Sequence, residues 1–232
     1  MEGVKIEDFI PHLSFDCVIF GFNGTVLKIL ILEYHDTKLF ALPGGFVRKN
    51  QSLQQAVQIG VKERTGLDDV YLDQFQVFGS LERSDPEAMK QILSANNEDL
   101  KKNKWMLDRF ITVGYYALIN YDEVTPVPDH LSDSIEWYPI DELPTLMMDH
   151  RNIVDKALET LRNNIDEKIV GMNLLSPKFT MKQLQCVYEA ILGQPLRRTT
   201  FQRKILSMDI LQRHEKLFTG TAHKAPYLYS FK

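Results

Sequence analysis

The sequence predicts an α/β domain followed by a small C-terminal module of two helices and a β-hairpin. Strand-like and helix-like segments alternate up to about residue 148, and no strand-like pattern follows until the last residues. Residues 171–232 contain ten Lys or Arg against three Asp or Glu, a net charge of +7, which leaves −11 for residues 1–170. An acidic front and a basic tail are typical of a polyanion-binding module joined to a different domain.

Short apolar runs with β-prone residues predict the strands of the first part. The Asn23-Gly24 pair lies between the first two runs, and it predicts a tight hairpin because Asn-Gly readily adopts positive φ angles. The predicted strands are residues 14–20, 26–33, 70–81, 110–119 and 134–138.

Two helices accompany these strands. Ser52 and Gln55 have the spacing of a reciprocal capping box, and Gly66 suits the left-handed position after a helix, so we predict a helix that ends near Thr65. A second helix, His150–Asn163, has an apolar stripe. We predict a domain over residues 1–148, a connector helix and linker over 149–170, and a C-terminal domain over 171–232.

A long polar stretch, residues 84–108, interrupts the strand pattern and is partly helical in composition. Long loops within domains are usually lids, binding loops or interface elements. A surface excursion without function remains an equal alternative.

Composition excludes several classes of protein. Hydrophobic residues make up 44% and charged residues 25% of the chain, which is ordinary for a globular protein. No apolar run approaches the ~20 residues that cross a bilayer, and the N-terminus lacks a secretory signal, so we expect a cytoplasmic protein without a membrane partner. Cys17 and Cys186 are expected to be buried thiols, and no Cys/His cluster has zinc-ligand spacing.

Residues 44–67, GGFVRKNQSLQQAVQIGVKERTGL, resemble the Nudix box. That motif has the form Gly, five residues, Glu, seven residues, then Arg-Glu-apolar-x-Glu-Glu-x-Gly-apolar. With Gly45 on the first Gly, the segment matches without a gap and Gly66 falls on the late Gly. The resemblance, which extends over residues 13–148 by strand order, implies an α/β (α+β) Nudix-like sandwich with a mixed sheet.

The residues that carry Nudix chemistry are mostly absent. Nudix enzymes hydrolyse nucleoside diphosphates with magnesium held by carboxylates of this helix. Gln51 stands at the first Glu, Ile59 and Gly60 replace Arg-Glu, Glu63 remains, and Arg64 replaces the last Glu. One carboxylate of four is left beside a guanidinium, which repels a divalent ion. We therefore predict no metal, no cofactor and no enzymatic activity. The alternative is a pyrophosphohydrolase, acting on ADP-ribose or a related compound, that uses acids from Glu82–Asp108.

The turn and helix of the motif survive, so a pocket can persist without catalysis. The positions around the motif predict the ligand-binding residues Gly44, Gly45, Phe46, Val47, Arg48 and Glu63.

The C-terminal module has the layout of a helix-turn-helix. Thr180 and Gln183 form a capping-box pair for a first helix, residues 193–195 break it, and Thr199 is the predicted cap of a second helix. Residues 216–231 suit a wing. Because Arg and Lys neutralise phosphates and helix N-termini reach base edges, we predict a DNA-binding surface. Its candidate residues are Arg197, Arg198, Thr199, Thr200, Gln202, Arg203, Lys204, His223 and Lys224, with Gln202 and Arg203 as base readers.

Together, the eroded Nudix box and the segment FTMKQLQCVYEAILGQPL…FQRKI resemble Nudix-related transcriptional regulators of the NrtR and AraR type. This resemblance implies a homodimer on a double-stranded operator with two half-sites. It also implies a small-molecule effector, either a sugar such as a pentose or an ADP-ribose-like molecule, and hence control of sugar or NAD-related metabolism. The residue 84–108 stretch departs from the family's compact pattern. A non-catalytic interaction module that does not bind DNA remains a further alternative.

Overall fold

The computed structural model describes residues 6–68, 70–169, 174–217 and 225–232. The strands are β1 (Phe9–Phe22), β2 (Leu27–Tyr34), β3 (Phe40–Ala41), β4 (Gly44–Arg48), β5 (Tyr71–Phe78), β6 (Ile111–Asn120), β7 (Ser132–Pro139), β8 (Phe179–Thr180), β9 (Leu211–Lys216) and β10 (Tyr227–Phe231). The α-helices are α1 (Leu53–Thr65), α2 (Pro86–Ala95), α3 (His150–Asn163), α4 (Ile165–Lys168), α5 (Met181–Leu192) and α6 (Arg198–Ser207).

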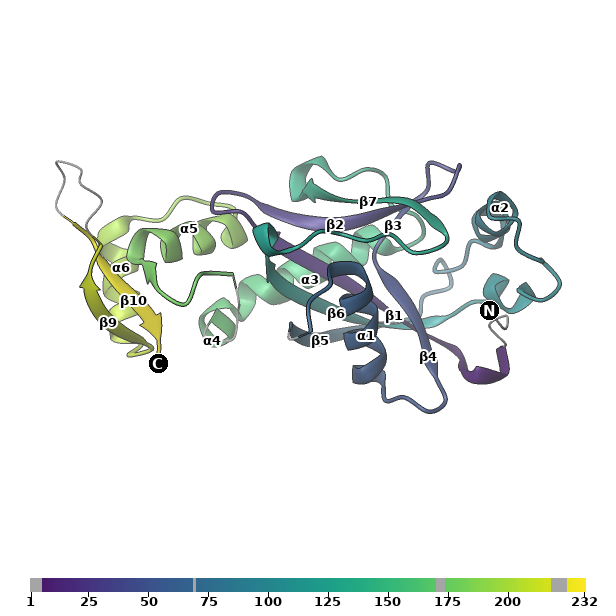
Figure 1. The fold of residues 1–232 in the computed structure, drawn as a ribbon, viewed down its shortest axis with the longest axis horizontal. Helices are drawn as coiled ribbons and strands as arrows, with labels where there is room; N and C mark the ends of the chain where they lie inside the picture. The colour runs from purple at the N-terminus through teal and green to yellow at the C-terminus, as the bar shows by residue number, and fades with distance from the viewer. Residues whose placement is uncertain (1–5, 69, 170–173, 218–224) are drawn as a thin grey trace.

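A mixed sheet organises the first part of the chain, as predicted (Figure 1). It has seven strands, two more than the sequence indicated, because the short strands β3 and β4 also pair with it. The central path is β3-β2-β1-β6-β5, with β4 paired to β1 and β7 paired to β2. Strand β1 pairs in parallel with β6 over ten residues, whereas its pairing with β2 and β4 is antiparallel. The length of β1 therefore lets one strand hold both halves of the sheet together.

Successive residues of β1 place their side chains alternately on the two faces of this sheet. Cys17 and Ile19 point to the face that α1 covers, and Val18 and Phe20 point to the face that α3 covers. All four are at most 1% exposed, because helices cover both sides of the strand. The continuous apolar run SFDCVIF thus reflects burial on two faces.

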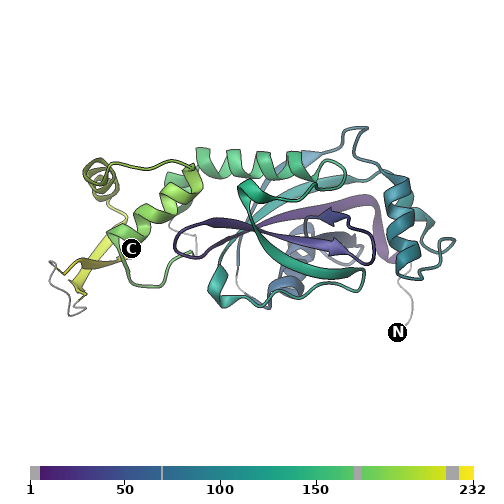
Figure 2. The same ribbon diagram turned by 90° about the horizontal axis from the view of Figure 1, so that it is seen from above.

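Helix α3 joins the two parts of the molecule. It crosses one face of the sheet and reaches the C-terminal domain (Figures 1 and 2). Leu161 belongs to one continuous apolar cluster with Tyr116 of the sheet and with Leu184 and Tyr188 of α5. Arg162 also donates from Nε to the carbonyl of Ile191 at 2.8 Å, at the C-terminal end of α5. The C-terminal domain is therefore packed directly against the end of α3.

The described residues of the C-terminal domain form two helices and a three-stranded sheet of order β8-β10-β9. Thr180 and Gln183 form the predicted capping box of α5, and Gly193 ends that helix at φ 69°. The predicted cap of α6 was wrong: α6 begins at Arg198, and its N-cap is Arg197 without a side-chain cap. Glu189 accepts from the Leu196 amide at 2.7 Å, which holds the turn so that α6 starts before Thr199.

Several predicted boundaries also change. Strand β1 begins at Phe9, ahead of a register shift near His12, which has φ 57°. The turn between β1 and β2 is longer than a two-residue hairpin, because Asn23 accepts from the Thr25 and Val26 amides through its side chain. The first wing strand is β9, upstream of the predicted one; its polar sequence LQRHEK is held by pairing with β10. Two predicted DNA-binding residues of the wing, His223 and Lys224, lie outside the described residues.

Cys17 is a buried free thiol and Cys186 is a half-buried one, so no disulfide joins them. In the described part of the chain, every helix is too short or too polar to span a bilayer.

The capping arrangement predicts a contrast between two threonines. Replacing Thr180 with Ala removes the Oγ1 that accepts from the Gln183 amide at 3.2 Å, so we expect the free energy of unfolding to fall by about 1 kcal/mol. The matched control is Thr199→Ala, an exposed position within α6, where we expect a change within about 0.5 kcal/mol. Urea denaturation measures both. Equal losses would show that Thr199 caps α6 after all.

Candidate effector pocket and DNA-binding surface

Residues 44–67, which resemble the Nudix box, form β4 and α1 and pack around an aromatic ring. The ring of Phe15, from β1, lies so near that a Cβ atom on Gly45 or on Gly60 would come within 2.9 Å of its Cζ atom. Glycine is therefore required at both positions unless the ring moves. A similar restriction applies to Gly44, whose added Cβ would lie 2.6 Å from Oδ1 of Asp16.

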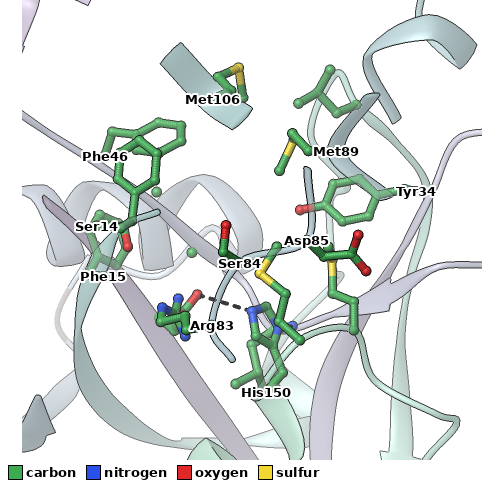
Figure 3. A pocket seen from close by; sticks show the side chains of 18 of the residues that line it. Ser14, Phe15, Tyr34, Phe46, Arg83, Ser84, Asp85, Met89, Met106 and His150 are labelled. Atoms are coloured by element: carbon green, nitrogen blue, oxygen red, sulfur yellow. Dashed lines mark hydrogen bonds and ion pairs between the residues drawn. The ribbon is translucent and has the colours of Figure 1, made fainter. Parts of the chain in front are cut away.

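A cavity of about 160 Å³ opens beside this turn (Figure 3). Its wall is mostly apolar and includes Phe15, Phe46 and Tyr34, together with four methionines. Figure 3 shows Phe15 and Phe46 on one side, Tyr34 and Met89 on the other, and Arg83 beside His150 at one end. Apolar walls with a few convergent polar groups are typical of small-molecule sites.

The residue 84–108 stretch forms one wall of this cavity. Its contribution comes from both ends of the stretch and consists of Ser84, Asp85, Met89, Met106, Leu107 and Asp108. Trp105 is buried against Phe46, with ring centroids 4.7 Å apart, and this contact holds the second end of the stretch in place. The stretch is therefore part of the pocket.

A buried ion-pair network occupies one end of the cavity. Nη2 of Arg83 donates to Oδ2 of Asp16 at 2.5 Å, and Nη1 donates to Oδ1 of Asp149. Arg83 is 6% exposed, so its charge is compensated by these carboxylates with little help from solvent. Asp16 lies in the central strand and Asp149 directly precedes α3, so the guanidinium ties the sheet to that helix.

Three of the six predicted ligand-binding residues line the cavity, and the other three do not. Gly44, Gly45 and Phe46 line the cavity. Val47 is fully buried in the core, Arg48 lies over the ring of Phe9, and the side chain of Glu63 is 64% exposed.

Sequence reasoning missed Asp16, Arg83, Asp149 and His150. One signal was present, because an Asp within the apolar run SFDCVIF needs a buried partner. The partner itself, 67 residues away, carries no local signal.

The exposed surface of α6 is basic. Arg197, Arg198 and Arg203 are exposed, and within the described residues none of them forms an ion pair. Thr199 and Thr200 are also exposed, and Gln202 is half-buried. Lys204 differs, because it pairs with Asp166 of α4 at 2.6 Å and lies 5.7 Å from the ring centroid of Tyr188. It is therefore less free to contact a polyanion than its neighbours on α6.

Strand β9 adds cations that sequence reasoning missed. Arg213 and Lys216 lie over the ring of Tyr227, at 4.7 and 5.3 Å from its centroid. The strand was hard to recognise because LQRHEK has no alternation of apolar and polar residues.

Two known protein families match this chain, one in each part. The model of the NUDIX domain matches residues 10–157. The chain belongs to the Nudix family. The model of the NrtR DNA-binding winged helix domain matches residues 171–231, so this Nudix protein carries a C-terminal winged helix.

Individual relatives show the same combination. The chain is 29% identical over 229 residues to the ADPR responsive transcriptional repressor NtrR of Acinetobacter baylyi, covering 95% of this chain and 82% of the relative. The crystal structure of Shewanella oneidensis NrtR is similar at 25% identity, with a TM-score of 0.70 and coverage of 95% and 94%. The same protein complexed with a 27mer DNA matches at 24% identity and a TM-score of 0.69, which supports the fold.

The donor set of this Nudix protein does not fit the family's metal. Arg64, at the last consensus Glu, pairs with Asp129 at 2.8 Å and lies 3.8 Å from Glu63. The Phe15 ring fills the space beside Gly60, where another carboxylate would begin. Across the described ranges no group of three or more His, Cys, Asp or Glu side chains is placed to hold a metal ion, including the acids of Glu82–Asp108.

His150, the first residue of α3, is a neutral part of the pocket. Nδ1 accepts from the Leu42 amide at 3.0 Å, and Nε2 lies 3.9 Å from Oδ1 of Asp16. Burial lowers the pKa of His150, an effect that the Asp16 carboxylate partly opposes. The imidazole therefore joins α3 to the strand region without carrying charge at neutral pH.

This arrangement predicts a pH dependence of stability. Because the folded pKa of His150 lies below the unfolded value of about 6.5, the unfolded chain binds a proton first as the pH falls. The contribution of His150 is complete above pH ~6.5 and declines as the pH drops below it. We expect His150→Asn, which keeps an acceptor for the Leu42 amide, to flatten the decline in unfolding free energy below pH ~6.5, measured by urea titration. A parallel decline in both proteins would contradict this assignment.

Proposed function

We propose that this protein is a transcriptional regulator in which a Nudix-like sensor domain controls DNA binding by a winged helix. The observation that carries the proposal is the exposed face of α6, where Arg197, Arg198 and Arg203 have no anionic partner among the described residues. Unpaired guanidinium groups on the second helix of a helix-turn-helix suit phosphates and guanine edges. The pocket that would sense the effector lies at the other end of α3.

The relatives support both halves of this proposal. The Acinetobacter baylyi protein is described as an ADPR responsive repressor, and the Shewanella oneidensis protein was solved with a 27mer DNA. By analogy, this chain would repress genes in response to a compound of sugar or NAD-related metabolism. A homodimer would place two recognition helices about 34 Å apart, matching half-sites one helical turn apart. Such a regulator shares a compartment with its operator, in agreement with the expected cytoplasmic location.

The effector would bind in the cavity beside Phe15 and Arg83. Its volume of about 160 Å³ lies below the ~300–1,000 Å³ of pockets that enclose drug-sized ligands. A pentose is the smaller candidate, whereas a molecule as large as ADP-ribose requires the wall formed by residues 84–108 to move outward. A thermal-shift screen with ADP-ribose, L-arabinose and D-ribose separates these effectors.

The proposal includes the loss of Nudix catalysis. We expect incubation with ADP-ribose and magnesium to give no turnover above the buffer control, because Arg64 and Phe15 occupy positions that the metal site would need. Phosphate release after phosphatase coupling measures this. Turnover that Glu63→Gln abolishes would establish the hydrolase instead.

The DNA-binding half predicts the effect of Arg203→Ala. We expect the binding free energy for a duplex enriched from a random pool to weaken by about 1–3 kcal/mol, because the variant lacks the guanidinium that would contact a base. The sequence preference should also relax. Fluorescence anisotropy measures the affinity, and log Kd should depend steeply on log salt concentration.

Lys156→Ala is the matched control for lost charge, because Lys156 lies on α3 and pairs with Glu159 at 2.7 Å. We expect little change in DNA affinity for this variant. Equal losses for Arg203→Ala and Lys156→Ala, or no enrichment of any duplex, would exclude DNA binding through α6.

A further inference from the structure

We propose that an anionic effector acts on the winged helix by drawing Arg83 away from Asp149, so that the pair serves as a positioning element for α3. This inference rests on the proposed function and deepens it, because it names how one pocket would regulate DNA binding. Four features of the described residues carry it.

The first feature is the scarcity of positive charge in the cavity. Arg83 is the only Lys or Arg among the described residues that line it, whereas Asp16, Asp85, Asp108 and Asp129 also line it. A diphosphate or another anion in the cavity therefore has one guanidinium to pair with. Arg binds phosphate through parallel hydrogen bonds from two of its nitrogens. Nη1 and Nη2 of Arg83 already bind carboxylates and only Nε has no partner among the described residues, so such a ligand competes with at least one of the carboxylates.

The second feature is that Asp149 does not cap the helix it precedes. Asp is among the best N-cap residues, because its carboxylate accepts from the free amides of the first turn. Asp149 has the N-cap position of α3, yet its side chain makes no capping hydrogen bond and its carboxylate binds Arg83 instead. Its backbone, at φ −95° and ψ 13°, also departs from the usual extended cap conformation.

The third feature is strain beside this residue. Met148 lines the cavity and has φ 47°, a left-handed conformation that costs energy for a side chain without a local polar bond. The segment that leads into α3 is therefore held in place by its surroundings. Release of Asp149 would allow this segment to relax.

The fourth feature is the connection to α6. Helix α3 has 14 residues, about 21 Å of rigid length, and its far end donates from Arg162 to the Ile191 carbonyl of α5. The following α4 contacts α6 through the half-exposed pair of Asp166 and Lys204 at 2.6 Å, and Ile165 of α4 and Phe201 of α6 belong to one apolar cluster. A change at Asp149 thus reaches the recognition helix through packed elements, and Figure 2 shows α3 extending from the sheet to the winged helix.

These features describe two states with different contacts. Without an anion, Arg83 binds Asp149 and the first turn of α3 lacks its side-chain cap. With an anion, Arg83 binds the ligand and Asp149 becomes free to cap α3. The ligand gains a contact in only one state, which is what a shift between states requires.

The test uses the full chain, a duplex enriched from a random pool, and ADP-ribose as the anionic probe. For the wild type, we expect saturating ADP-ribose to change the Kd for DNA by at least about fivefold, within the usual range of allosteric coupling. Asp149→Asn and Asp149→Ser lose the ion pair with Arg83 but keep good N-cap residues. We expect both variants to bind DNA with the affinity of the liganded wild type, and ADP-ribose to change that affinity by less than about twofold.

Asp155→Asn is the matched control, because Asp155 lies on the exposed side of α3 and pairs only with Arg151 among the described residues. It should respond to ADP-ribose like the wild type. Isothermal titration calorimetry should show that all four proteins still bind ADP-ribose. A full response in Asp149→Asn and Asp149→Ser would overturn the inference, as would a wild type that responds to L-arabinose or D-ribose but not to ADP-ribose.

A second readout follows the helix end directly. We expect ADP-ribose to slow hydrogen exchange of the Arg151 and Asn152 amides in the wild type, because these amides gain the Asp149 carboxylate as an acceptor. No slowing there, with ADP-ribose bound, would overturn the inference even if DNA affinity changes. Absence of DNA binding in every protein would instead reject the proposed function.

Discussion

The buried guanidinium of Arg83 pairs with two carboxylates that belong to different parts of the fold. Asp16 belongs to the central strand and Asp149 precedes α3, so one guanidinium joins the sheet to the helix that carries the winged helix. Removing Arg83 would leave two carboxylates without compensation, which typically costs several kcal/mol, whereas removing one carboxylate leaves the other paired with the guanidinium. Arg83 and Asp16 line the pocket, so a ligand that enters either leaves this pairing intact or competes for the guanidinium.

The apolar core connects the surroundings of Arg83 to the winged helix. One cluster runs from Phe20 in the sheet, through Leu161 of α3, to Phe201 of α6. Packed interiors respond to displacement as units, because neighbouring side chains leave little free volume. The winged helix is therefore attached to the sensor domain by packing as well as by the chain, which is the physical basis for coupling a pocket to a DNA-binding surface.

Patterns of local origin were predictable from the sequence, and contacts between distant residues were not. The apolar stripe of His150–Asn163 predicted the bounds of α3, and the glycine spacing of residues 44–67 predicted the turn and α1. The start of α6 was wrong because Glu189 fixes the preceding turn from another helix. Arg83 went unnoticed because both of its partners are more than 60 residues away, and nothing in a polar segment distinguishes a buried Arg from an exposed one.

In the proposed regulator α6 would read the DNA, and the Nudix-like domain, distant from the duplex, would control it. A crystal structure of the full chain with its enriched duplex tests this most directly. We expect α6 of each protomer to lie in the major groove of one half-site, with Arg203 at a base edge and the Arg83 cavity away from the DNA. A duplex seated on the Nudix-like domain, or on any face that leaves α6 exposed to solvent, would contradict it.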